Sequence, residues 1–395
     1  MSILTKLPRK GLKLAHINIC SLRNKMTEIN DLLNSNNIHI LAISETHIDH
    51  TVSDNAVNIQ GYSIYRKDRS INGGGVALYI QSHIPAKIRQ DLMPSSIEAL
   101  WLQVHLPHVK PLLIGCCYRP PSAKSEYLDT LCEMMIDVCD IGKEVYLMGD
   151  MNINWLSREC PLKIKVESVT NACSLTQVIK QNTRICINSA GKMTSTCIDH
   201  IFTNAVDLCS KGVSVPIGCS DHNIVAIARK AKVPKVAPKV VYKRSYKGFS
   251  QELFCKDVSD ICWSEIYKEE NPGEAIKSFE NVFYEIVNKH AKVKKFTVKN
   301  VRAPWIDQDL KEFMLKRDIS KGVANMTGNK DDWQIYCKLR NQVTNINRKN
   351  KRMYFNTKLN ECKYDGKKLS STLNDIMGRK PSSTPSLLMI LVNYS

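Results

Sequence analysis

Short apolar runs separated by polar turns make up the first part of the chain, from residue 12 to about residue 228. Runs of about four to eight residues bounded by Gly, Pro, Asn or Asp are typical of β-strands. The pattern predicts strands at residues 12–19, 38–44, 62–66, 74–80, 98–106, 112–118, 144–150, 197–203 and 223–229. Apolar positions three and four residues apart predict helices at 21–37 and 125–140. Many strands with few helices favour a mixed α/β sandwich over a regular doubly wound sheet.

The pattern changes at residues 229–247, where Lys, Pro, Ala and Val alternate without a clear period. We interpret this stretch as a basic linker. Beyond it, the apolar spacing predicts helices at residues 250–263, 273–291, 305–322 and 331–359. The predicted domains are residues 12–228, the linker 229–247, a basic helical region 248–380, and a tail 381–395 for which we predict disorder.

The charge of the chain is divided unevenly between these regions. The 395 residues carry a formal net charge of +18. Residues 1–228 hold 22 Lys and Arg against 20 Asp and Glu, whereas residues 229–395 hold 34 against 18. The basic second part indicates a polyanionic partner, although a solvated basic surface would give the same count.

The cysteines and the ends of the chain bear on the cellular compartment. The 15 cysteines include no CxxC pair, and several lie in strand-like runs, where free Cys packs as a small hydrophobic residue. The first residues lack the apolar core of a signal peptide, and no run reaches membrane-spanning length. We therefore expect a reduced, intracellular protein that does not enter a membrane.

Polar residues end most of the predicted strands in the first 228 positions. They are Asn18, Glu45, Tyr118, Asp150, Asn152, Asp199, Asp221 and His222. Desolvating a carboxylate or an amide without a partner is costly. Because such polar residues recur at several strand ends, the sequence predicts one polar pocket into which these ends open. For "GDMN" at 149–152, a simple Asx-rich turn remains an alternative.

The residue types of this predicted pocket favour a hard divalent cation. Carboxylate and amide oxygens suit Mg²⁺, with Mn²⁺ as an alternative. Mg²⁺ keeps several waters and needs few protein ligands, so a single Glu assisted by Asn and Asp is in keeping with it. Such an ion, with an Asp that serves as a base and a His that faces anionic oxygen, is typical of phosphoester cleavage.

Six motifs in a fixed order carry a resemblance to a known family. They are Asn18, "SET" at 44–46, "YRPP" at 118–121, "GDMN" at 149–152, "IDHIFT" at 198–203 and "SDH" at 220–222. In this order and spacing the chain resembles the endonuclease/exonuclease/phosphatase superfamily over residues 12–228. With "GGGVALYI" it looks more narrowly like the endonuclease domain of a non-long-terminal-repeat (LINE-type, jockey-like) retrotransposon. The resemblance implies a four-layer α/β sandwich, two mixed sheets face to face with helices outside.

The resemblance also implies roles for the residues around the ion. Glu45 would bind the metal with Asn18 beside it, and Asp221 would act near the metal through water. Asp150 would orient or deprotonate the attacking water, and Asn152 would hold the phosphate or that water.

Three further residues would act on the phosphate itself. Tyr118 would donate a hydrogen bond to a phosphate oxygen, and His222, oriented by Asp199, would stabilise the charge that builds on the phosphoryl oxygens. Pairing with a buried carboxylate independently favours a cationic imidazole. Some repair relatives carry an acid two residues after the first Asn, where this chain has Cys20, so a second metal mode that uses that acid is not expected.

Contacts to nucleic acid are predicted in both parts of the chain. Near the pocket they involve Arg119, which can instead brace the double-proline turn, and Thr196. In the last long helix they involve Lys338, Arg348, Lys349, Lys351 and Arg352. The segments at 304–318 and 333–341 resemble the stretch that precedes the reverse transcriptase in such elements, and we expect the chain to be truncated before that enzyme.

Together these features predict a hydrolase acting on ester bonds: a Mg²⁺-dependent phosphodiesterase that nicks DNA as an endonuclease and derives from a retrotransposon. The basic helices would add affinity for DNA, and for RNA as a second partner. A phosphatase or phosphodiesterase of the same fold, or an inert nucleic-acid-binding remnant, are the alternatives. The basic runs predict entry into the nucleus.

Overall fold

The computed structural model describes residues 7–8, 10–187, 192–234, 239–298 and 303–377. The chain forms two compact units. The first unit contains Met1–Pro234 together with Val301–Ser395, and the second contains Lys235–Asn300. The predicted tail at 381–395 lies outside the described residues.

The first sheet of unit 1 is mixed. In spatial order its strands are β13 (Val213–Val215), β14 (Ile224–Arg229), β1 (Leu12–Asn18), β2 (Ile40–Ser44), β4 (Val76–Gln81) and β3 (Tyr62–Lys67). The pair β1–β2 is parallel, and β14, β4 and β3 add antiparallel to their neighbours.

The second sheet is also mixed. In spatial order its strands are β5 (Ala86–Ile88), β6 (Glu98–Val104), β7 (Leu112–Tyr118), β8 (Glu144–Asp150), β12 (Asp199–Thr203) and β9 (Thr176–Gln177). Only β7–β8 is parallel among its described pairs. A separate two-stranded ribbon pairs β10 (Arg184–Ile187) with β11 (Met193–Thr196).

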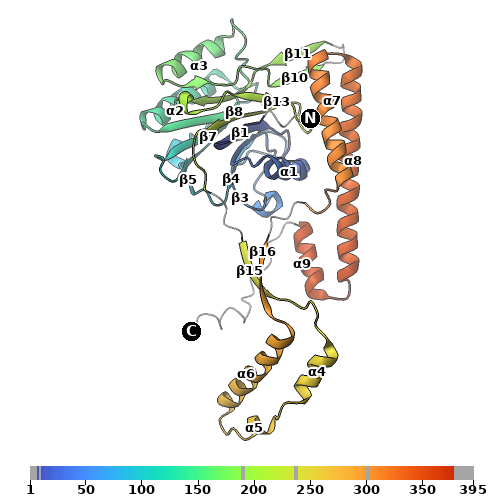
Figure 1. Ribbon diagram of the computed structural model, residues 1–395. Helices are drawn as coiled ribbons and strands as arrows, with labels where there is room; N and C mark the ends of the chain where they lie inside the picture. Colours follow the sequence, from blue (N-terminus) through green and yellow to red (C-terminus); the bar gives the residue numbers. More distant parts are fainter. Residues whose placement is uncertain (1–6, 9, 188–191, 235–238, 299–302, 378–395) are drawn as a thin grey trace. The chain divides into compact units, whose positions relative to one another are not determined.

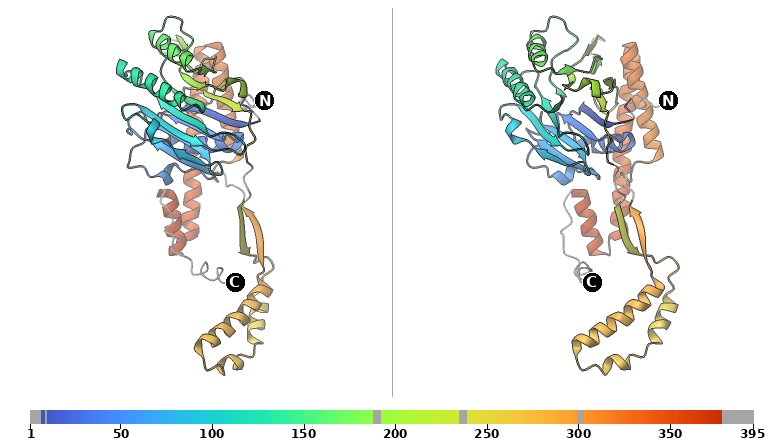
Figure 2. Two further views of the ribbon diagram at one scale, coloured as in Figure 1. Left: turned by 90° about the vertical axis from the view of Figure 1, so that its left-hand side faces the viewer. Right: turned by 60° about the vertical axis from the view of Figure 1, so that its left-hand side comes forward.

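Helices cover the outer faces of the two sheets. They are α1 (Met26–Asn36), α2 (Ser125–Asp140) and α3 (Pro161–Ala172), with short 3-10 turns η2 (Arg23–Lys25), η3 (Asp54–Val57), η4 (Gln90–Leu92) and η5 (Val206–Leu208). The views agree that α1 and the pair α2–α3 lie on opposite sides of the sheets (Figures 1 and 2). The predicted sandwich of two mixed sheets flanked by helices is therefore confirmed.

The alternation of β1 shows how one strand serves two cores. Leu12 and Leu14 join the core between the sheets, whereas Ala15 and Ile17 join the core under α1. Successive side chains of a strand point to opposite faces. The inner row of β1 continues through His16 to Asn18, so this row changes from apolar to polar as it approaches the end of the strand.

Unit 1 also includes three helices from the far end of the chain, α7 (Gln308–Thr327), α8 (Lys330–Cys362) and α9 (Gly366–Met377). Helices α7 and α8 form an antiparallel hairpin whose turn contains Gly328 at φ +64°. The helices expected at 305–322 and 331–359 are thus present. They belong to the same compact unit as the sandwich.

Unit 2 is small and mostly helical. It contains the antiparallel pair β15 (Lys239–Arg244) and β16 (Val293–Val298) and the helices α4 (Gln251–Ser259), α5 (Ser264–Tyr267) and α6 (Pro272–His290). Strand β15 lies within the stretch that the sequence presents as an aperiodic linker. No helix in the described part of the chain is long and apolar enough to cross a membrane.

Candidate active site

The candidate site lies where the two sheets end on the same side. Tyr118, Asp150 and Asp199 are direct cross-strand partners on β7, β8 and β12, so their side chains stand in one row. Asn18 ends the inner row of β1 in the facing sheet, and Glu45 follows the last residue of β2. Polar residues at the ends of five strands from both sheets therefore converge.

Asn18 joins two carboxylates across the sandwich. Its side-chain Nδ2 donates to Glu45 Oε1 at 2.9 Å and to Asp150 Oδ2 at 2.8 Å. Asn18 is fully buried, and its Oδ1 accepts from the backbone N of Cys20 at 3.1 Å. One amide thus fixes the distance between residues that are far apart in sequence.

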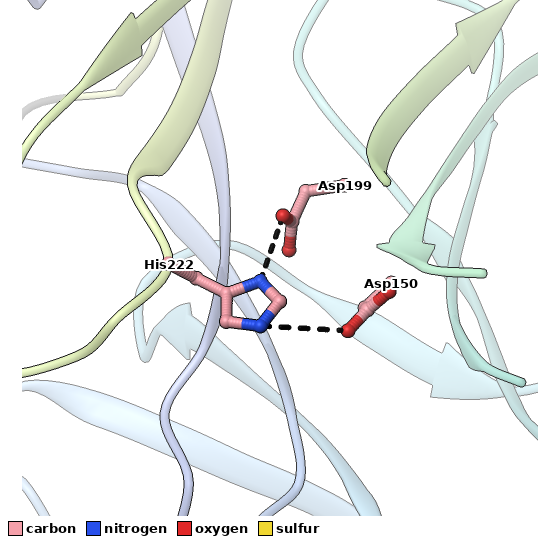
Figure 3. A group of neighbouring side chains, drawn as sticks. All are labelled: Asp150, Asp199 and His222. Carbon is pink, nitrogen blue, oxygen red and sulfur yellow. Dashed lines mark hydrogen bonds and ion pairs between the residues drawn. The ribbon is translucent and has the colours of Figure 1, made fainter. Parts of the chain in front are cut away.

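His222 stands between two buried aspartates (Figure 3). Its Nδ1 bonds Asp199 Oδ2 at 2.8 Å, and its Nε2 lies 3.9 Å from Asp150 Oδ2. Burial would lower the pKa of His222, but the carboxylate of Asp199 outweighs it and raises this pKa to about 9. The imidazole is therefore cationic at neutral pH, with Nε2–H directed at the centre of the site.

The two acids nearest the centre have different affinities for protons. Burial, followed by repulsion from Asp199, raises the pKa of Asp150 to about 7. Burial would also raise the pKa of Glu45, but hydrogen bonds from Asn18 and Tyr118 bring it below its ordinary value. Asp150 can accept a proton near neutral pH, while Glu45 keeps its negative charge.

Several residues next to these strand ends adopt positive φ, among them Glu45 and Asn152. Glu45 has φ +52° and Asn152 has φ +50°, values that are uncommon for residues other than glycine and concentrate at functional sites. The backbone N of Asn152 donates to Asp150 Oδ1 at 2.9 Å, and its Nδ2 donates to the carbonyl of Arg119 at 2.8 Å. One oxygen of Asp150 is therefore held by the turn that follows it.

Asp221 lies on the rim of the site rather than at its centre. Its Oδ2 pairs with Arg184 Nε at 3.0 Å, and Cys20 Sγ lies 3.5 Å from its Oδ1. Burial would raise the pKa of Asp221, but His222 and Arg184 lower it to about 2. Burial raises the pKa of the Cys20 thiol, so Cys20 is protonated and offers no thiolate.

The donor set is compatible with a hard divalent cation. Asp150, Asp199 and His222 bring ligand-type atoms within 4.8 Å of one another, but a cationic imidazole has no lone pair to give, so the carboxylates are the candidate ligands. Glu45 approaches Asp150 through their shared partner Asn18. Asp199 Oδ1 is buried and has no hydrogen-bond partner among the described residues. Carboxylate oxygens without a thiolate suit Mg²⁺ or Mn²⁺ better than soft metals.

The residues predicted to contact nucleic acid lie in different surroundings. Arg119 is 3% exposed, and its guanidinium donates to the carbonyl of Ala123 at 3.0 Å, so it braces the double-proline turn. Thr196 is half-buried on β11. On α8 the predicted contacts Lys338, Arg348, Lys349, Lys351 and Arg352 are all exposed.

Several residues that support the site are not among the candidate site residues of the sequence, although Ser220 belongs to the "SDH" motif. Thr183 Oγ1 accepts from the backbone N of Asp199 at 3.1 Å. Ser220 Oγ accepts from the backbone N of His222 at 3.1 Å and donates to the carbonyl of Asn18 at 2.6 Å. His16 lies buried on the inner row of β1, with Nδ1 3.6 Å from Asp199 Oδ1. Only the inner-row position of His16, two residues before Asn18, could have suggested it.

The least expected contributor is Lys321 of α7, about a hundred residues after His222. Its side chain is fully buried, and Nζ donates to the carbonyls of Ile217, Ser220 and His222 at 2.9, 2.6 and 3.3 Å. Nearby, Asp318 Oδ1 accepts from the backbone N of Gly218 at 2.8 Å. The segment that carries His222 is thus held in place by α7.

The fold is an α/β sandwich of two mixed sheets, and the site at its edge gathers buried acids and a histidine that could hold a metal ion. The chain belongs to the Endonuclease/Exonuclease/phosphatase family, whose model matches residues 15–222. No curated protein shows a significant sequence match to the chain.

Three solved structures illustrate the similarity of fold. The endonuclease domain of TRAS1, a telomere-specific non-LTR retrotransposon, is 14% identical, with a TM-score of 0.45, covering 56% of this chain and 99% of that one. The 3'-5' exonuclease NExo from Neisseria meningitidis is 17% identical, with a TM-score of 0.45, covering 55% and 100%. An AP endonuclease from Archaeoglobus fulgidus is 15% identical, with a TM-score of 0.44, covering 56% and 100%.

Proposed function

We propose that this protein is a Mg²⁺-dependent DNA endonuclease that nicks DNA by hydrolysing a phosphodiester. One observation carries the proposal: the carboxylates of Glu45 and Asp150, which Asn18 bridges, converge with the His222–Asp199 pair. Asp150 as proton acceptor and the cationic imidazole of His222 suit in-line displacement at phosphorus, because that reaction depends on positioning and charge neutralisation.

The residues divide the work of hydrolysis. Asp150 accepts a proton from water as the water oxygen bonds to phosphorus, since its pKa of about 7 allows both protonation states near neutral pH. His222 donates from Nε2 to a phosphoryl oxygen, and Asp199 holds the imidazole in that orientation through Nδ1. Tyr118 donates to another phosphate oxygen. The phosphorus–oxygen bond then breaks, and the departing oxygen takes a proton from a solvent water and leaves as a hydroxyl group.

Glu45 and Asn18, with Asp221 through water, would hold the divalent ion. Such an ion supplies charge neutralisation at the phosphate and lowers the pKa of a bound water. Asn152 would hold the phosphate or the water; its Nδ2 donates to the carbonyl of Arg119 at 2.8 Å, which orients the side chain.

The retrotransposon origin is part of this proposal. Its support is the narrower resemblance of "GGGVALYI", "YRPP" and "IDHIFT", together with the basic character of residues 229–395. The cations Lys338, Arg348, Lys349, Lys351 and Arg352 add sequence-independent affinity for nucleic acid, including RNA. Basic runs of this kind favour entry into the nucleus.

A plasmid assay tests the proposal. The full chain is incubated with supercoiled plasmid and Mg²⁺, and we expect nicked circles that EDTA, Asp150→Asn and His222→Gln each abolish. Asp207→Asn and His105→Gln are matched controls, because both residues are exposed and lie outside the six site motifs. These controls should nick at the wild-type rate.

The outcomes separate the alternatives. Release of phosphate from small phosphomonoesters, with plasmid untouched, would instead identify a phosphatase. A gel shift without nicking at any Mg²⁺ or Mn²⁺ concentration would identify a nucleic-acid-binding remnant and would refute the proposal.

A further inference from the structure

A cavity of about 590 Å³ lies between helix α8 and the segment that leads into α1, and it extends to residues 219–221 next to His222. One wall carries Arg340, Arg348 and Lys351 of α8, and the opposite wall carries Arg23 and Lys25. We call this cavity the α8 groove. It shares Ser220 and Asp221 with the six-motif site, and its other wall comes from the helical region that follows the sandwich.

The charge of the α8 groove is strongly positive. Its two acids are already paired, since Glu28 bonds Arg317 Nη1 at 2.7 Å and Asp221 bonds Arg184 Nε at 3.0 Å. Five cations of the lining therefore face the cavity without an acid of the lining to neutralise them. A confined positive cavity with both polar and apolar lining is suited to a phosphate backbone rather than to a small apolar ligand.

The wall formed by α8 is held firmly against the sandwich. Tyr336 is buried, and its hydroxyl donates to the carbonyl of Gly218 at 3.1 Å. Trp305 Nε1 donates to Thr27 Oγ1 at 3.3 Å, and its ring lies 5.7 Å from that of Phe355 on α8. The α8 groove is therefore a preformed feature of the unit that contains the site.

The spacing of the three α8 cations suits one strand of DNA. Residues 340 and 351 are eleven positions apart, which at ~1.5 Å per residue is about 16 Å along the helix. Successive phosphates of one B-DNA strand advance by about 3.4 Å along the duplex axis. The wall therefore spans about five nucleotides.

We propose that the α8 groove binds the backbone of the duplex DNA on one side of the scissile phosphate, so that helix α8 is part of the substrate-binding surface of the nuclease. This inference rests on the proposed endonuclease function and adds to it the path of the DNA. It assigns a direct role to Arg340, Arg348 and Lys351, and only a general electrostatic role to the other cations of α8.

The helix itself supplies a matched control. With about 3.6 residues per turn, Arg340, Arg348 and Lys351 share one face, whereas Lys338, Lys349 and Arg352 lie on another. All six are exposed, and none of the second three lines the cavity. The triple variants Arg340→Gln/Arg348→Gln/Lys351→Gln and Lys338→Gln/Lys349→Gln/Arg352→Gln therefore remove the same charge from two faces of one helix.

Duplex binding is measured by fluorescence anisotropy in EDTA, over a series of salt concentrations, with circular dichroism melts to verify that both variants fold. Losing three phosphate contacts should make the slope of log K against log salt shallower by about 2.7 for the groove variant. We expect a change of less than about one for the control variant. Equal changes in the two variants, or an unchanged slope in the groove variant, would overturn the inference.

The same proteins are then tested for nicking of supercoiled plasmid. If wild type nicks and both variants bind equally, the inference fails and the proposed function stands. If no protein nicks but the slopes differ as expected, the proposed function fails and the α8 groove stands as a DNA-binding surface. Preference for RNA over duplex DNA in the groove-dependent binding would also overturn the proposal.

Discussion

Replacing Lys321 by methionine tests whether helix α7 supports the segment that carries His222. Methionine is also unbranched, but it lacks the ammonium group that donates to the carbonyls of Ile217, Ser220 and His222. Because Lys321 is fully buried, solvent does not readily take its place. The substitution therefore leaves up to three acceptors without a partner.

The expected loss of stability follows from these contacts. A buried acceptor left without a partner costs about 1–3 kcal/mol, so three cost about 3 kcal/mol at the lower end of that range. Part of this is offset, because burial lowers the pKa of Lys321 to about 8 and the cost of burying its charge disappears. We expect the free energy of unfolding in urea to fall by about 2–3 kcal/mol.

The expected loss of activity is larger than the loss of stability alone would give. A displacement of a catalytic group by about 1 Å can cost ~100-fold in rate. At a temperature where the variant is fully folded, we expect kcat for nicking to fall by about that factor while KM changes little, and the NMR titration of His222 to shift. Lys316→Met, an exposed lysine on the same helix, is the control. If the two variants behave alike in unfolding, kcat and the His222 titration, α7 does not position the catalytic segment.

Three further predictions concern charge and metal. Asp199→Asn should lower the pKa of His222 from about 9 towards or below 6.5. In wild type, the His222–Asp199 ion pair contributes about 3 kcal/mol to the free energy of unfolding. This contribution is fully present below pH 6.5 and is lost as pH rises through 9. The gap in unfolding free energy between wild type and this variant should therefore narrow as pH rises, and a constant gap would contradict the assignment. Because its pKa is lowered to about 2, Asp221 stabilises the fold above pH 3.8, its ordinary pKa, and this stabilisation is lost as pH falls to 2. The free energy of unfolding of Asp221→Asn should therefore depend less on pH between 3.8 and 2 than that of wild type. An unchanged pH dependence would argue against the pairing of Asp221 with Arg184. Mg²⁺ should raise the melting temperature of wild type by binding the native state, but not that of Glu45→Gln; equal shifts in the two proteins would place the ion elsewhere.

The sequence predicts the sandwich well because its buried strands have simple patterns. Helix α2 and strands β7 and β8 have the bounds that their apolar spacing indicates. The short strands β5, β9 and β13 are not predicted, since two or three residues are too few to show a period. Strand β15 lies in a Lys-rich stretch whose composition resembles that of a linker, and only its pairing with β16 reveals it.

The site is predictable in its residues but not in its connections. The polar strand ends indicate Asn18, Asp150 and Asp199, because polar residues at the ends of apolar runs are unusual. No local pattern indicates that one amide joins Glu45 to Asp150, since this requires the register of two sheets. Lys321 is missed for a similar reason, because a lysine on an amphipathic helix is expected to be solvated.

The connectivity of unit 2 has a consequence for how such a chain can change over time. The main chain leaves unit 1 at Pro234 and returns at Val301, and the antiparallel pairing of Lys239 with Val298 brings outgoing and incoming strands within about 5 Å of each other. Topologically, unit 2 is an insertion between Pro234 and Val301 of unit 1. Recombination could therefore exchange or delete unit 2. Loss of the later helices would instead remove Lys321, which holds the segment that carries His222.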